Sequence, residues 1–81
     1  MSNEDLLKVY EVELLKVIEE SKKEAENPRT AILNSSYNNG RIFGLLKAIE
    51  IISIEDFMRI YEDVKPRIEE LLDINEGIYE L

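Results

Sequence analysis

The segment from Ile42 to Ile52 limits the possible folds of this chain more than any other feature. Read as a helix at about 100° per residue, it carries apolar side chains in nearly every direction around its axis. These side chains are Ile42, Phe43, Leu45, Leu46, Ile49 and Ile51. A helix that is apolar on all sides is normally buried. The segment therefore predicts a buried central helix, with other helices packed around it.

A row of small residues follows the same predicted helix. Gly40, Gly44 and Ala48 are spaced by four residues, so they lie on one line along the helix surface. Small side chains let a second helix backbone approach closely. Two interpretations stay open: close packing of helices within one subunit, or a helix crossing between subunits. Phe43 is expected to contribute to the same packing surface.

Residues that start or stop helices divide the chain into three predicted helices, at about residues 3–26, 28–52 and 54–75. Ser2 and Ser53 each precede a helical pattern and are followed three positions later by an acidic residue, which is the capping-box arrangement. Asn27-Pro28 ends the first helix and begins the second, because the residue before proline avoids the α region and proline is favoured at the first helical position.

Three positions interrupt the helical pattern. Asn38-Asn39-Gly40 resembles a turn, but the apolar residues on either side keep one helical phase, which favours a single helix from 28 to 52. Pro66 removes one backbone hydrogen bond, so it predicts a kink in the third helix. Gly77 is expected to end that helix as its C-cap. The predicted fold is one all-α domain over residues 1–81.

The composition argues against several classes of function. The chain has no cysteine and no histidine, so the usual nucleophile–base pairs are absent and a zinc site would need carboxylates alone. No phosphate-binding loop, dinucleotide-binding motif or calcium loop is present. A net charge of −8 disfavours direct binding to nucleic acid. We therefore expect a protein that is not an enzyme and that uses no cofactor or metal.

Size and hydropathy lead to expectations about assembly and location. A chain of 81 residues without disulfides buries a modest core, and such domains often gain stability by oligomerising. We expect a homo-oligomer, most simply a dimer. The apolar runs are too short for a membrane span and the N-terminus lacks the features of a signal peptide. The expected location is the cytoplasm, without membrane attachment.

Charge is distributed unevenly along the chain. Residues 27–53 carry Arg29, Arg41 and Lys47 against the single acid Glu50, whereas acids exceed bases in both flanking segments. The central segment is therefore the part of the chain best suited to an anion.

Arg41 is the most informative residue of this segment, because an arginine among apolar positions needs a carboxylate or a phosphate as partner. One interpretation is an ion pair with a glutamate, within or between subunits. The other is a bidentate contact with an anionic, nucleotide-like ligand. In that case Asn38 and Asn34 are placed to contact sugar or base edges, and Tyr37 to stack on the ligand.

The run from Tyr37 to Leu45 resembles a helix found in small all-helical proteins of bacteriophages and prophages of low-GC Gram-positive hosts. The resemblance covers about residues 37–51. It implies a small, non-enzymatic phage accessory protein located in the host cytoplasm. Proteins of this general kind often antagonise host defence, either by sequestering a signalling nucleotide or by covering a defence enzyme.

Three hypotheses of function follow. The first is a protein that sequesters a small anionic, nucleotide-like ligand around Arg41, which requires Arg41 to open onto a pocket. The second is an acidic inhibitor that covers the basic, nucleic-acid-binding surface of a partner protein. It requires the acids of the first and third helices to share one face. The third is a structural oligomerisation module in which Arg41 forms an internal ion pair.

Overall fold

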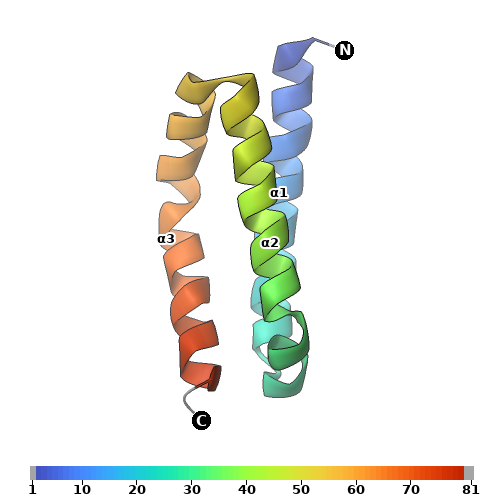
Figure 1. Ribbon diagram of the computed structural model, residues 1–81, viewed down its shortest axis with the longest axis vertical. Coiled ribbons are helices and arrows are strands. Elements are labelled where there is room, and N and C mark those ends of the chain that lie inside the picture. The colour runs from blue at the N-terminus through green and yellow to red at the C-terminus, as the bar shows by residue number, and fades with distance from the viewer. Residues whose placement is uncertain (1, 80–81) are drawn as a thin grey trace.

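The computed structural model describes the backbone of residues 2–79 and the side chains of residues 2–31 and 33–74. Three helices account for nearly all of it: α1 (Asn3–Ala25), α2 (Pro28–Ile52) and α3 (Ile54–Tyr79). They run alternately down, up and down in an elongated bundle that measures 45 × 20 × 15 Å (Figure 1). The described residues contain no strand, and the all-α prediction is confirmed.

The helix starts follow the predicted caps. The side-chain oxygens of Ser2 and Ser53 each accept a hydrogen bond from the backbone N–H three residues later, at 3.2 and 3.3 Å. Asn27 caps α2 with its side-chain oxygen, and Pro28 occupies the first helical position. These local interactions satisfy backbone donors that have no partner within the helix. They fix the two short connections that fold the chain back on itself.

Of the three predicted interruptions, none breaks a helix. α2 continues through Asn38-Asn39-Gly40, as the helical phase of its apolar residues predicted. α3 continues through Pro66, and the kink at this residue stays a prediction. The predicted C-cap at Gly77 is wrong, because α3 extends to Tyr79 and no described glycine has a positive φ. A glycine weakens a helix by about 1 kcal/mol relative to alanine but does not by itself end it.

The core lies where the three helices meet. Its most deeply buried side chains come from all three helices: Leu14, Val17, Ile18, Ile42, Ile49, Ile60, Val64 and Leu71. α2 contacts both α1 and α3. Within the described residues, no helix is long and apolar enough to cross a membrane.

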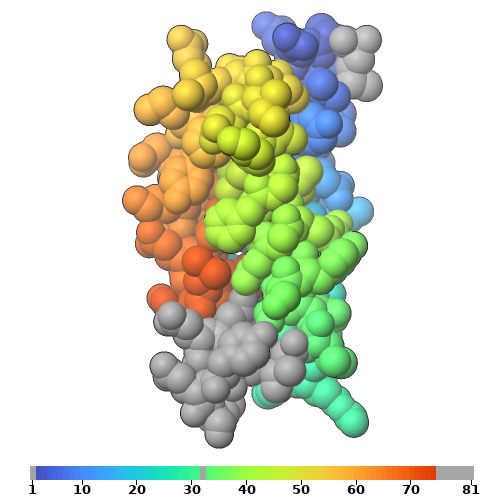
Figure 2. Space-filling view, viewed as in Figure 1, coloured from blue at the N-terminus to red at the C-terminus, as the bar shows by residue number. Residues whose placement is uncertain are grey.

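The prediction that α2 is buried on all sides is wrong. Ile42 and Ile49 are buried, but Phe43 is 48% exposed and Ile51 is 75% exposed. The physical reason is geometric: in a three-helix bundle, each helix has only two neighbours, and both lie on the same side of it. Half of α2 therefore faces outwards, and it forms much of the face seen in Figure 2, where it is coloured green to yellow-green.

Candidate functional site

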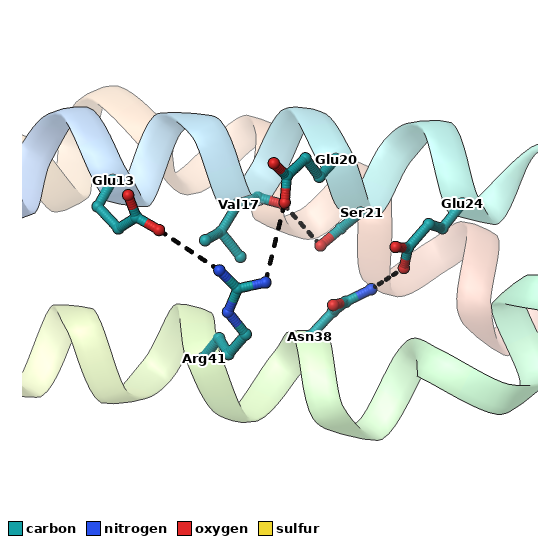
Figure 3. A network of polar contacts seen from close by, with 7 residues as sticks. All are labelled: Glu13, Val17, Glu20, Ser21, Glu24, Asn38 and Arg41. Atoms are coloured by element: carbon teal, nitrogen blue, oxygen red, sulfur yellow. Dashed lines mark hydrogen bonds and ion pairs between the residues drawn. The ribbon is translucent and has the colours of Figure 1, made fainter.

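Arg41 lies on the side of α2 that faces α1, between two carboxylates of α1 (Figure 3). Its Nη2 is 3.4 Å from Oε1 of Glu13, and its Nη1 is 3.8 Å from Oε2 of Glu20. Its guanidinium carbon is 5.6 Å from the centre of the Tyr37 ring. Glu13 and Glu20 are seven residues apart, about two helical turns, so they project from the same side of α1. The guanidinium thus has two carboxylates and an aromatic ring as partners within the subunit.

Asn38 continues this polar seam one helical turn earlier on α2. Its side-chain amide donates a hydrogen bond to Oε2 of Glu24, and the residue is only 6% exposed. Ser21, also buried, donates from its hydroxyl to the backbone carbonyl of Val17 at 2.7 Å. No buried side-chain nitrogen or oxygen in the described part of the chain lacks a partner. The seam between α1 and α2 is therefore polar, internally satisfied and partly buried (Figure 3).

Two cavities lie near or between the helices. The first has a volume of about 10 Å³ and is lined by Ser21, Glu24, Ala25, Ala31, Ser35, Asn38, Asn39 and Leu71. This volume holds about one water molecule. The second, about 250 Å³, lies between the starts of α1 and α3 and is lined by Glu4, Leu7, Lys8, Glu11, Asp56 and Arg59. Arg41 and Tyr37 line neither cavity.

The structure brings Arg41, Asn38 and Tyr37 into one neighbourhood, as the sequence suggested. Of the three, only Asn38 lines one of the two cavities described above. Tyr37 is 67% exposed and Asn34 is partly buried, whereas Asn38 is buried against α1. The sequence analysis did not identify their carboxylate partners. The seven-residue spacing of Glu13 and Glu20 does indicate that both carboxylates project from the same side of α1, where one arginine could contact both. No group of three or more potential metal ligands occurs among the described residues.

The small residues of α2 face away from the core. Gly40 and Gly44 are exposed, and a Cβ atom added at either position would meet no atom within 4 Å. Of the two interpretations of this row, close packing within the subunit is therefore wrong at both glycines. Ala48 is partly buried at the edge of the same face.

Large apolar side chains continue the line of the two glycines. Leu33 and Ile51 are each 75% exposed, and Tyr37 is 67% exposed. We call Leu33, Tyr37, Gly40, Gly44 and Ile51 the outer stripe. Phe43 lies beside it and is 48% exposed.

Arg41→Ala is expected to lower the free energy of unfolding by about 1 kcal/mol or less, because both ion pairs are long and partly exposed. Chemical denaturation at low and high salt checks this expectation. The loss should shrink at high salt, since exposed ion pairs are screened. A loss of about 3 kcal/mol or more, the size expected for a buried pair, would contradict it.

Comparison with known proteins finds no protein-family model, no curated protein and no solved structure that matches this chain. Fold and surface define the class on their own: an antiparallel three-helix bundle whose polar seam is internally paired. Its distinguishing surface feature is the outer stripe of α2.

Proposed function

We propose that this protein is a non-enzymatic binding module that recognises another protein chain through the outer stripe of α2. The observation that carries the proposal is the row of large, exposed apolar side chains on a helix whose opposite face already fills the core. Single exposed apolar residues are normal on protein surfaces. An aligned row of them, with two glycines that let a backbone approach, is typical of an interaction surface.

The size of this surface supports the proposal. Leu33, Tyr37, Phe43 and Ile51 together present on the order of 500 Å², taking about 150–250 Å² for a fully exposed side chain of this size. The largest apolar patch of a typical monomer is about 300–600 Å² and is often functional. The outer stripe and Phe43 expose a summed area of this order, spread along about 27 Å of α2 as a row rather than as one contiguous patch.

A small anionic ligand at Arg41 is less well supported. Its guanidinium lies within 4 Å of carboxylate oxygens of both Glu13 and Glu20. A phosphate at this position would have to displace these carboxylates and would then lie beside them, which is electrostatically unfavourable. The cavity next to Asn38 has room for about one water molecule. The nucleotide-binding hypothesis therefore requires a rearrangement of the seam.

A second candidate, the acidic inhibitor, is favoured by one observation on α3. Glu55, Glu62 and Glu69 are all exposed and are seven residues apart, so they form a row along the outside of this helix. Lys65 and Arg67, also exposed, lie on the same helix and reduce its net charge. This row has no apolar core comparable to the outer stripe, so we place it second.

Site-specific photo-crosslinking tests the proposal. A photoreactive phenylalanine analogue replaces Tyr37, or Leu33, in the chain expressed in cells, and the same analogue at Glu62 serves as the control. We expect higher-mass protein adducts from positions 37 and 33 in excess of those from position 62. Adducts from position 62 alone would favour the acidic inhibitor. No adducts from any position, together with stabilisation by a nucleotide that Arg41→Ala abolishes, would favour the ligand-binding hypothesis.

A further inference from the structure

We infer that the occupant of the outer stripe is a second copy of this chain, docked by antiparallel pairing of the two α2 helices around a two-fold axis that crosses the stripe between Gly40 and Gly44. The inference rests on the proposed function and names the partner at the same surface. It follows from the order of the residues along the stripe, the unexplained glycines and the charges of α2.

Four of the five residues of the outer stripe, Leu33, Gly40, Gly44 and Ile51, are arranged symmetrically about its centre. Leu33 precedes Gly40 by seven residues, and Ile51 follows Gly44 by seven residues. In an antiparallel pair centred between the two glycines, Leu33 lies at the level of Ile51 of the second copy, and Gly40 at the level of Gly44. A two-fold interface requires a surface that is complementary to itself. These four residues meet that requirement, whereas Tyr37 lies opposite Lys47.

The two glycines have no role within the subunit. A Cβ at Gly40 or Gly44 would meet no atom within 4 Å, and neither residue has a positive φ. Alanine at either position would therefore fit the bundle and strengthen α2, because glycine is a poor helix former. A partner helix at this surface explains the absence of side chains at Gly40 and Gly44, since two helix backbones approach most closely where both lack side chains.

Charge favours this face over the others and favours the antiparallel direction. The chain carries a net charge of −8, but α2 holds three bases and only one acid, Glu50, which pairs with Lys47 at 3.1 Å. Two copies therefore meet with least repulsion along α2. In the antiparallel register, Lys47 lies at the level of Tyr37 of the second copy, so the two lysines are kept apart. A parallel pair would bring two Lys47 side chains to the same level.

The size of the pairing surface sets the affinity that we expect. The apolar surface of about 500 Å² per copy compares with about 800 Å² per partner in a standard interface. We therefore expect a dimer of moderate affinity.

Sedimentation and light scattering from about 1 to 100 µM test this inference. The mass should rise from the 9.5 kDa of one chain to twice that value. Gly44→Glu acts twice at the two-fold axis and should raise the dimer dissociation constant by at least about 30-fold. Lys65→Ala, on the outside of α3, should leave it unchanged. Circular dichroism should show that both variants keep their helical content.

Alanine at the glycines gives a signature that misfolding cannot imitate. Gly40→Ala with Gly44→Ala should raise the melting temperature of the monomer, measured at low concentration, and at the same time weaken dimerisation. These opposite movements follow because alanine improves α2 but fills the contact between the two backbones. If the melting temperature of the monomer and the affinity of the dimer both rise, the glycines do not mark the interface, and the inference is wrong.

Disulfide trapping tests the direction of pairing, and the chain suits it because it contains no cysteine. Leu33→Cys mixed with Ile51→Cys should oxidise mainly to the mixed product, whereas a parallel pair would link Leu33→Cys to itself. Only the mixed product agrees with the inferred register. The chain could stay monomeric at all concentrations and still form photo-adducts with another protein at position 37. This result would show that the partner is not a second copy, but it would agree with the proposed function. A monomer that forms no adducts overturns both.

Discussion

Ile49→Ala is expected to lower the free energy of unfolding by about 3 kcal/mol, within the range of about 2–5 kcal/mol for truncation of a buried isoleucine. Ile51→Ala should lower it by less than about 0.5 kcal/mol. The two isoleucines are neighbours on α2, yet Ile49 is fully buried and Ile51 is 75% exposed. The first substitution leaves a cavity between the helices, whereas the second shortens a side chain that is mostly in contact with solvent.

Urea denaturation measures both losses, at a concentration low enough that association does not contribute. The stability of a domain of this size lies at about 4–12 kcal/mol, so Ile49→Ala alone removes a large part of it. Equal losses for the two variants would show that α2 is rotated relative to the arrangement described here. A loss for Ile51→Ala that appears only at high protein concentration would instead report the dimer.

Asn38→Asp is expected to destabilise the bundle by about 2–4 kcal/mol at neutral pH. Asn38 is 6% exposed and donates a hydrogen bond to the carboxylate of Glu24. The substitution removes this donor and places a second carboxylate against the first, in a region with little water to screen them. Asn38→Ala removes the donor without adding charge, so it should cost less, about 1–3 kcal/mol.

A compensating substitution distinguishes the loss of the Asn38–Glu24 hydrogen bond from the general cost of burying a charge at position 38. Glu24→Gln combined with Asn38→Asp reverses the donor and the acceptor, so the double variant should recover most of the stability lost in Asn38→Asp. Asn3→Asp, an exposed change of the same kind in the first turn of α1, should alter stability by less than about 0.5 kcal/mol. If Glu24→Gln fails to rescue Asn38→Asp, the hydrogen bond across the seam does not account for the loss.

The ion pairs of Arg41 show which features of the site could be predicted from the sequence. An arginine among apolar neighbours predicted an anionic partner, because its charge has to be compensated wherever it is shielded from water. The choice between the 18 acidic residues of the chain depended on how α1 is aligned along α2. That alignment places Glu13 and Glu20 on either side of Arg41 and Glu24 against Asn38. The residues in these contacts are 14 to 28 positions apart in the sequence. No pattern of neighbouring residues therefore predicts which of them pair.

Local sequence signals were sufficient to predict the three helices and the connections between them, except for the end of α3. Caps at Ser2, Asn27 and Ser53 act within a few residues, and the helical phase of α2 extends through Asn38-Asn39-Gly40, so local rules sufficed. Which half of α2 is buried depends on the packing between the helices. Because residues 42–52 are apolar on nearly every side, their sequence pattern does not show which side of α2 is buried. The positions of α1 and α3 determine the buried side: they cover Ile42 and Ile49 and leave Gly40, Gly44 and Ile51 exposed.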